Sequence, residues 1–212
     1  MLVLSRSLLL SLLCCALAVT SAHGAEDARQ LAAFRAINIH GPINIEVHAG
    51  KAQSVKVMGR PEFIGKVLTS VKSDELRIDY AEKNNVNLKD GDKIVITVPS
   101  LVKCIVEGAG QVVIDNVKEE RIDLQFEGAG RLEAKGSTKW LRLKARGVGE
   151  VITRDLKTDR ADVNFEGIGD VKVHASQTLN AVVRGMGSLT YYGKPKALNK
   201  SVSGIGNVTA GD

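Results

Sequence analysis

The first candidates for chemistry in this sequence are glycines, which form six Gly-x-Gly triplets at intervals of 18 to 20 residues. A phosphate-binding loop needs glycines between a strand and a helix whose N-terminus meets the phosphate. Here each triplet is followed by an alternating, strand-like stretch such as EVIT or DVKV. We therefore interpret the glycines as structural corners, where the chain turns sharply and where a positive φ angle, if required, is tolerated. The predicted corners are Gly108, Gly110, Gly128, Gly130, Gly147, Gly149, Gly167, Gly169, Gly185, Gly187, Gly204 and Gly206.

Polar residues flank the triplets on both sides and are the second candidate for a functional site. Those just before the triplets are Glu107, Glu127, Arg146, Glu166, Arg184 and Ser203, and those just after them are Gln111, Arg131, Glu150, Asp170, Ser188 and Asn207. In the first row the charges alternate in sign from Glu127 onward, so neighbours neutralise one another. We expect both rows to form one polar stripe, with Tyr192 as an outward ring that could stack on a sugar. The candidate ligand surface is Glu107, Glu127, Arg131, Arg146, Glu150, Glu166, Asp170, Arg184 and Tyr192.

No catalytic residue, metal or cofactor is predicted from the remaining reactive side chains. A calcium-binding roll would need a nine-residue period, and the alternating charges give no cluster of three carboxylates. His40 and His48 could face the same way, but no Cys or acid lies beside them at ligand spacing. Cys104 falls in an apolar row, so we expect a buried and unreactive thiol.

The elements that position these residues follow from apolar rows at fixed distances from the triplets. Two residues after each triplet stand Val112, Leu132, Val151, Val171, Leu189 and Val208. Two residues before each triplet stand Val106, Phe126, Ala145, Phe165, Val183 and Val202, and four before stand Cys104, Leu124, Leu143, Val163, Ala181 and Lys200. Polar residues lie between them, which is the period of two that is typical of strands. Short repeats of about 20 residues must stack to bury such a face, so the sequence predicts a parallel β-solenoid.

The chain of 212 residues, with 44% hydrophobic and 25% charged residues, is long enough for a packed core. Residues 25–103 are less regular than the repeats of residues 104–212. They contain strand-like stretches at 37–47 and 54–59, further strands in DELRIDY and KIVITVPS, and one short helix predicted over 61–71. We expect irregular first coils and a cap that protects the solenoid end from edge pairing, within a single domain spanning 25–212.

Residues 1–24 have the pattern of a secretory signal peptide. Arg6 precedes an apolar run from Leu8 to Val19, and small residues follow up to Gly24. A retained N-terminal anchor is the alternative. Without these residues the formal charge falls from +5 to +4 and no Lys/Arg block remains, so we expect no nucleic-acid partner. Because the apolar run is removed with them, we also expect no stable membrane span after processing. The predicted location is the periplasm, the cell surface or the medium.

The repeated triplets, the DELRI segment and the closing LTYYGKPKALNKSVSGIGNV together resemble the bacterial secreted family called the head GIN domain, or auto-transporter adhesin. The resemblance covers about residues 34–210. The family often has Ser-Gly-Ser-Gly at its corners, whereas here Glu or Arg comes first in five of six corners and the third residue is Ala, Val, Ile or Met. The resemblance implies a right-handed parallel β-helix and an envelope or surface setting, and it supplies no catalytic residues.

The sequence therefore predicts a secreted, non-enzymatic β-helix that presents polar rows to a glycan or to a protein of the envelope or surface. Two alternatives remain open, a carbohydrate-active enzyme on the same architecture and a purely structural assembly module. The assembly hypothesis rests on the C-terminus, where no capping segment follows the last triplet and Lys200 interrupts an apolar row. We expect the last coil to be distorted, or covered by a second copy in a homo-oligomer.

Overall fold

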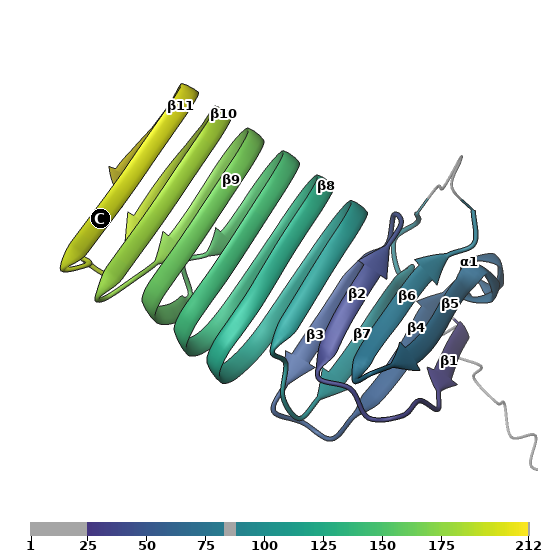
Figure 1. Ribbon diagram of the computed structural model, residues 1–212. Coiled ribbons are helices and arrows are strands. Elements are labelled where there is room, and N and C mark those ends of the chain that lie inside the picture. Colours follow the sequence, from purple (N-terminus) through teal and green to yellow (C-terminus); the bar gives the residue numbers. More distant parts are fainter. Residues whose placement is uncertain (1–24, 83–87, 212) are drawn as a thin grey trace, which may run out of the picture.

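The computed structural model describes residues 25–82 and 88–211, so the predicted signal peptide lies outside the described residues. These residues form an all-β fold in which strands stack as the coils of a β-solenoid (Figure 1). The strands are β1 (Ala25–Arg29), β2 (Ala36–His40), β3 (Ile45–Ala49), β4 (Ser54–Gly59), β5 (Val67–Lys72), β6 (Glu75–Tyr80), β7 (Lys93–Val98), β8 (Lys103–Thr153), β9 (Leu156–His174), β10 (Thr178–Tyr192) and β11 (Ala197–Ala210).

The repeats stack in parallel with their glycines aligned. β8 runs through the first three triplets, and its last part pairs with β9, which pairs with β10, which pairs with β11. The register joins Gly147 to Gly167, Gly167 to Gly185 and Gly185 to Gly204. Each coil in Figure 1 rises along the front, turns at the upper edge and descends behind. Equivalent residues of successive repeats therefore form straight rows along the molecule.

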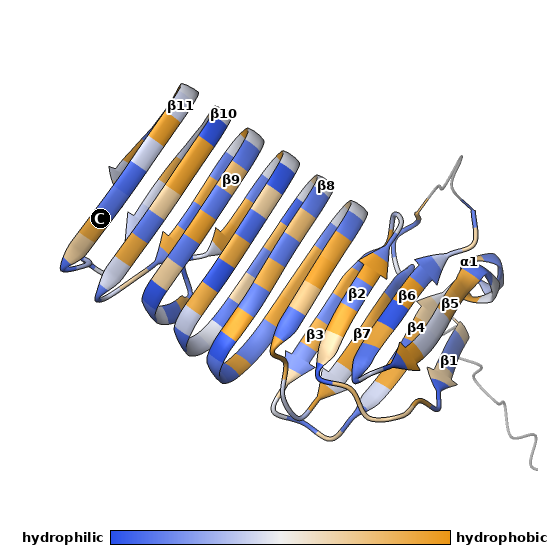
Figure 2. Ribbon diagram, in the orientation of Figure 1, coloured by the Kyte–Doolittle hydropathy of each residue, from blue (hydrophilic) through white to orange (hydrophobic). Residues whose placement is uncertain are grey.

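The predicted apolar rows fill the interior except in the last coil, where Val202 is 41% exposed because no coil covers it. Figure 2 shows the alternation along each ribbon. Leu143 aligns with Val163 and Ala181, and these side chains are at most 3% exposed. One cluster of buried residues runs from Phe34 to Val208. Thr153 is fully buried among them, but its hydroxyl donates a hydrogen bond to the Lys172 carbonyl at 3.1 Å. The hydroxyls of the buried Thr138 and Thr158 likewise donate to backbone carbonyls, so the buried hydroxyls of this apolar core are paired.

The corners bring the backbones of neighbouring coils into close contact. Gly147 has a φ of +123°, and a Cβ atom there would collide with the carbonyl oxygen of Gly128 in the preceding coil. Gly167 has a φ of +150° and meets the carbonyl of Gly147 in the same way. Both the left-handed dihedral angle and the lack of space require glycine.

The order of coils in space differs from their order in the sequence near the N-terminus. β2 and β3 form a coil that turns at Gly41–Ile43, and the first coil of β8 stacks on one side of it. The later strands β6 and β7 stack on its other side. The chain therefore returns past its first coil before the repeats begin. This arrangement was not predicted, because it depends on pairing between segments far apart in the sequence, such as β2 with β6.

Antiparallel strands end the stack at the N-terminal side. β4 pairs with β7, β1 with β4 and β5 with β6, all antiparallel. Helix α1 (Pro61–Lys66) packs Phe63 against Tyr80 with ring centroids 5.9 Å apart. The helix does not continue to residue 71 as predicted, because the chain from Val67 pairs with β6 as strand β5. Among residues 25–82 and 88–211, no helical segment has the length and hydropathy of a membrane span.

The last coil is regular, so the prediction that it is distorted was wrong. β11 keeps its register with β10 from Ala197 to Ala210. Lys200 aligns with Ala181 of the buried row. It is tolerated because the outer side of β11 is exposed, and its Nζ atom donates to the Val208 carbonyl at 3.4 Å.

Candidate ligand-binding face

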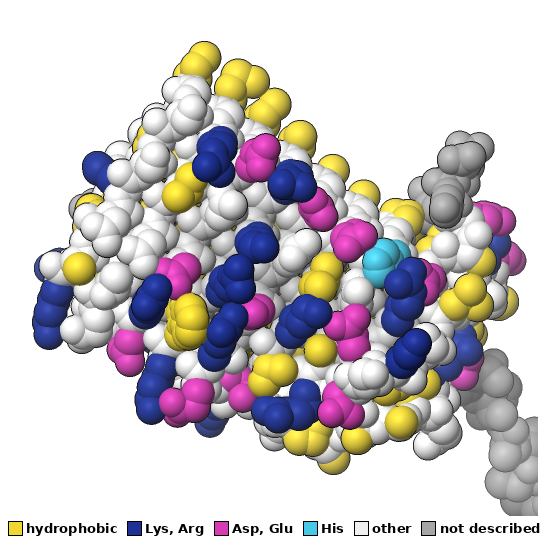
Figure 3. Space-filling model, viewed as in Figure 1, with side chains coloured by type: hydrophobic (Ala, Val, Ile, Leu, Met, Phe, Trp, Pro, Cys, Tyr) yellow, Lys and Arg dark blue, Asp and Glu magenta, His cyan; other side chains and the backbone are white. Residues whose placement is uncertain are grey.

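The strand segments that precede the corners form one broad face, which we call the leading face (Figure 3). Three rows of outward side chains run along it from coil to coil. The rim row, next to the corners, contains Glu107, Glu127, Arg146, Glu166, Arg184 and Ser203. The floor row, two residues earlier, contains Ile105, Gln125, Lys144, Asn164, Val182 and Ser201. The inner row, two residues earlier again, contains Lys103, Asp123, Arg142, Asp162, Asn180 and Asn199.

The rim row is a chain of ion pairs, as its alternating charges predict. Arg146 donates hydrogen bonds to Glu127 at 2.8 Å and to Glu166 at 3.3 Å. The charge of Glu166 and these hydrogen bonds raise the pKa of Arg146. Toward the N-terminus the row continues with His40, whose Nε2 atom lies 3.3 Å from a Glu107 oxygen. Arg184 contacts the Asn164 side-chain oxygen at 3.4 Å and has no carboxylate partner among the described residues.

A shallow groove of about 160 Å³ lies between the rim row and the floor row. Its lining is Gln125, Phe126, Glu127, Lys144, Ala145, Arg146, Asn164 and Glu166. Two further hollows of about 90 Å³ and 250 Å³ continue it across the floor row toward the inner row. All three hollows are lined in part by Lys144. The face is therefore hollowed around one lysine.

The strand through Lys144 carries three exposed cations in succession, Arg142, Lys144 and Arg146. Arg146 is neutralised within the rim row, but Arg142 and Lys144 form no side-chain hydrogen bond or ion pair with other described residues. In register beside Lys144 lies the amide of Asn164. Unpaired ammonium and guanidinium groups next to amides can bind carboxylate, sulfate or hydroxyl groups of a ligand.

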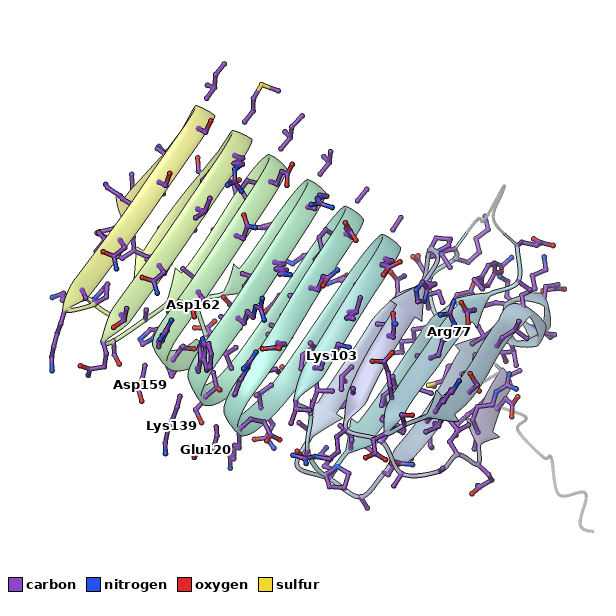
Figure 4. The ribbon with its side chains drawn as sticks, viewed as in Figure 1. Arg77, Lys103, Glu120, Lys139, Asp159 and Asp162 are labelled. Atoms are coloured by element: carbon purple, nitrogen blue, oxygen red, sulfur yellow. The ribbon has the colours of Figure 1, made fainter. Side chains whose placement is uncertain are left out.

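In contrast, the carboxylate of Asp162 in the inner row already accepts hydrogen bonds from neighbouring side chains. Burial alone would raise the pKa of Asp162, but hydrogen bonds from Asn180, Arg160 and Trp140 outweigh it, so the pKa is lowered. The Trp140 indole donates to Asp162 at 2.7 Å. Figure 4 shows Asp162 and Lys103 on this face. In the same view Glu120, Lys139 and Asp159 lie along the lower edge of the solenoid, opposite the corners at its upper edge. The carboxylate of Asp162 thus fixes its surroundings and leaves Arg142 and Lys144 of the preceding coil to a ligand.

The four other predicted ligand residues lie on the strands that follow the corners, which form the trailing face. Arg131 bridges Glu133 at 3.0 Å and Glu150 at 2.8 Å, and Lys172 also holds Glu150 at 2.8 Å. Tyr192 lies under the Arg154 guanidinium, 5.3 Å from the ring centroid. Asp170 occupies the same row as Glu150.

The two predicted rows do not form one continuous polar stripe. The middle residues of the triplets stand between them, and the larger ones are exposed and apolar, such as Ile168 at 47%. Of the predicted ligand residues, the structure brings Glu127, Arg146 and Glu166 together at the groove. Glu107 and Arg184 continue the rim row on either side of it.

The single tryptophan is also engaged within the fold. Arg121 and Arg160 lie over the Trp140 ring at 4.2 and 5.0 Å from its centroid. The register with β9 places Arg160 beside Trp140. Its ring therefore stabilises the stack of coils.

The prediction that Cys104 is buried is confirmed. The thiol is fully buried, and burial raises its pKa to about 12. His40 and His48 lie on β2 and β3, on either side of one corner, and approach different carboxylates. They therefore do not form the metal-binding pair that their alternation allows. Across residues 25–82 and 88–211, no three His, Cys, Asp or Glu side chains are grouped to hold a metal ion.

Sequence reasoning missed the floor and inner rows. Their signal was present in LRLKAR, where alternation places Arg142, Lys144 and Arg146 on the outer side of one strand. Arg142 and Lys144 are not adjacent to the glycines, so the repeat pattern of the corners does not mark them. Whether a cation is neutralised depends on the coils beside it, and the register supplies that information.

The described residues therefore define a β-solenoid with polar outer rows and glycine corners. A family model described as "Putative auto-transporter adhesin, head GIN domain" matches residues 33–195, and the chain belongs to this family. Its fold is similar to that of a "putative adhesin" from Bacteroides fragilis, with 23% identity, a TM-score of 0.73, and coverage of 90% of this chain and 98% of that chain.

Two other solved structures are similar at lower scores. A "putative lipid binding protein" from Parabacteroides distasonis has 19% identity and a TM-score of 0.49, and covers 90% of this chain and 98% of that one. A "putative adhesin" from Parabacteroides merdae has 14% identity and a TM-score of 0.49, and covers 90% and 97%. A search of curated protein sequences gave no match.

Proposed function

We propose that the protein is a non-enzymatic, adhesin-type binding module of the bacterial envelope. We further propose that its leading face binds a linear glycan that carries acidic groups. The family and the fold of the Bacteroides fragilis protein support the adhesin-like class. A carbohydrate-active enzyme is the alternative, but no observation on the described residues favours it.

The observation that carries the proposal is the unpaired cation at the centre of a hollowed face. Lys144 is exposed, lines all three hollows of the leading face and has no ionic partner in the described part of the chain. Arg142 lies two residues away on the same strand and is also unpaired. A ligand carboxylate between them would receive charge-assisted hydrogen bonds, which are stronger than those between neutral groups.

The rest of the face would supply weaker contacts that repeat with the coils. Gln125 and Asn164 flank Lys144 and present amide groups that can bond to sugar hydroxyls. Coils follow one another at about 4.8 Å, so equivalent side chains recur along an extended polymer. Several such contacts on one chain would give useful affinity although each is weak. Binding would involve no covalent change in the ligand.

The test is binding of the purified protein to an array of acidic and neutral glycans. The change Lys144→Ala should weaken binding to the acidic glycans at least about tenfold, which is the loss of one charge-assisted hydrogen bond. Lys157→Ala is the matched control, because Lys157 is an exposed lysine on another surface of the solenoid. Added salt should weaken binding by the wild type more than binding by Lys144→Ala.

The possible results of this experiment test the site, the ligand and the non-enzymatic class separately. Binding that Lys144→Ala retains would reject the leading-face site and direct attention to the trailing face around Arg131 and Tyr192. A lack of binding to any glycan would reject the glycan proposal. Release of shortened glycans into solution would overturn the non-enzymatic proposal.

We also propose that the protein is exported and that residues 1–24 are removed. The proposal rests on the sequence pattern, since these residues lie outside the described range. Mass spectrometry of the protein from the periplasm or medium should give an N-terminus after Ala22 or Gly24. An intact N-terminus in the membrane fraction would favour the retained anchor instead.

A structural assembly role is the second candidate, and the exposed edge of β11 favours it. This strand pairs with β10 on one side only among the described residues, and most of its side chains are exposed. A long unpaired strand edge can join another strand. We propose that a second copy covers it, and light scattering at high concentration tests this. A wild type that stays monomeric would reject it.

A further inference from the structure

The corners of the repeats carry a row of exposed apolar side chains. The middle residues of the six triplets, which we call the corner row, are Ala109, Ala129, Val148, Ile168, Met186 and Ile205. The four larger ones are exposed by 54%, 47%, 51% and 79%. Figure 3 shows them as a line of hydrophobic side chains along the upper edge. Only two other large hydrophobic residues in the described part of the chain, Leu68 and Val202, are exposed to a similar degree.

The corner row has an unusual shape and charged borders. Its side chains grow along the chain, from alanine in the first two coils to methionine and isoleucine in the last two. The rim row borders it on the leading face, and the row with Arg131, Glu150 and Asp170 borders it on the trailing face. Exposed apolar side chains in a continuous line with polar borders mark an interaction surface. The mixed charges of the borders do not favour an anionic membrane, which attracts basic residues.

We propose that the corner row is an interface with a second copy of this chain, which runs antiparallel to the first. The two-fold axis lies between the coils of Val148 and Ile168. The large side chains at one end then meet alanines, since Ile205 faces Ala109 and Met186 faces Ala129, and the mid-sized Ile168 and Val148 face each other at the centre. The two tapered rows thus fit along their whole length.

The charges of the rim row match in the same arrangement. Arg184 of one copy faces Glu127 of the other, and Arg146 faces Glu166. Arg184 has no carboxylate partner among the described residues of its own chain, so the second copy would supply one. On the trailing side Glu150 faces Asp170 of the second copy, but Glu150 is already held by Arg131 and Lys172.

A parallel arrangement fits less well. Each corner residue would face its own equivalent, so contact between the Ile205 side chains would leave a gap between the Ala109 side chains. Arg184 would face Ser188, which cannot neutralise it. Oppositely charged and size-matched contacts therefore select the antiparallel pair.

The interface is narrow, which sets its strength. Six coils at a spacing of about 4.8 Å give a row about 24 Å long. A contact of this length and one side chain in width lies at the small end of protein interfaces, so the dimer forms reversibly and at high local concentration. Molecules crowded on one surface, or on two facing surfaces, meet this condition. The inference holds whether or not the leading face binds a glycan.

The test is sedimentation equilibrium of the purified protein from micromolar to millimolar concentration. Wild type should dimerise, and the double change Ile168→Ser with Met186→Ser should raise the dissociation constant at least about tenfold. Leu68→Ser is the matched control, because Leu68 is as exposed as Val148 but lies on β5 in the cap, and it should have no effect. Val202→Lys, in the exposed last coil, should also have no effect.

Charge exchange and cross-linking test the orientation. Arg184→Glu should weaken the dimer, and adding Glu127→Arg should restore it. With Cys14 and Cys15 changed to Ser, a chain carrying both Ala109→Cys and Ile205→Cys should form intermolecular disulfides, whereas Ala109→Cys alone should not. A monomer throughout, a dimer abolished by Val202→Lys only, or cross-linking by Ala109→Cys alone would overturn the proposal. Binding of neutral lipid vesicles through the corner row without dimerisation would overturn it as well.

Discussion

The substitution Gly147→Ala tests the role of the corners. Gly147 has a φ of +123°, which an alanine adopts only with strain of about 1–3 kcal/mol. The added Cβ would also collide with the Gly128 carbonyl and lie 3.0 Å from the Gly128 nitrogen. Moving that backbone aside resembles overpacking a core, at about 1–3 kcal/mol. We therefore expect the free energy of unfolding to fall by about 2–6 kcal/mol.

The assay is urea unfolding followed by Trp140 fluorescence and by circular dichroism. A loss of about 4 kcal/mol corresponds to a melting temperature lower by about 8–16 °C in a chain of this length. Gly65→Ala is the control, because no atom lies within 4 Å of its added Cβ and its φ is not positive. This variant should be as stable as the wild type or more stable by up to about 1 kcal/mol.

Position along the solenoid gives a second comparison. Gly204 in the last coil has a φ of +114° and meets the Gly185 carbonyl in the same way as Gly147 meets that of Gly128. Gly204→Ala should have a smaller effect on Trp140 fluorescence, since only the terminal coil must open to relieve the strain. A Gly147→Ala variant within about 1 kcal/mol of wild type would refute the reasoning that the coils meet too closely for a side chain.

Two further predictions concern pH. Burial raises the pKa of Cys104 to about 12, above that of the unfolded chain, so stability present below about pH 8.5 is lost as the pH rises. Between about pH 8 and pH 10, wild type should lose about 2 kcal/mol more than Cys104→Ala in urea unfolding, and equal losses would contradict this. Burial would raise the pKa of Asp92, but hydrogen bonds from Arg60 and the Lys89 amide lower it, so its contribution is present above about pH 4 and lost in acid. Asp92→Asn should cost about 1–2 kcal/mol at neutral pH and less near about pH 3, and a cost independent of pH would count against the ion pair.

The repeating part of the fold could be predicted because one pattern occurs six times. The apolar rows through Leu143 and Val151 follow from alternation, and the glycines mark the corners between them. The irregular part could not be predicted in the same detail. The strands after Gly59 stack outside the first coil, and this order depends on pairing between segments far apart in the sequence, such as β2 with β6. The handedness of the solenoid remains a prediction.

The candidate site was predicted in part. Charges beside the glycines point outward because of their position in the alternation, and Glu127, Arg146 and Glu166 do meet at the groove. Two features were missed for physical reasons. The sequence does not show that Lys144 lacks a neighbouring acid, because its neighbours come from other coils. Nor does it show that the middle residue of each triplet projects into solvent and divides the two polar rows.

The position of the β2–β3 coil between β6–β7 and β8 has a consequence for biogenesis. While the chain emerges in N-to-C order, this coil has two open sides, and its outer side stays open until β6 and β7 have appeared. Once they dock and the antiparallel cap closes, growth is possible on one side only. We expect the cap then to act as a seed with a fixed direction of elongation, onto which each repeat adds as it becomes available. Repeats could be gained or lost downstream without disturbing this seed, so the number of coils can change while the starting point stays the same.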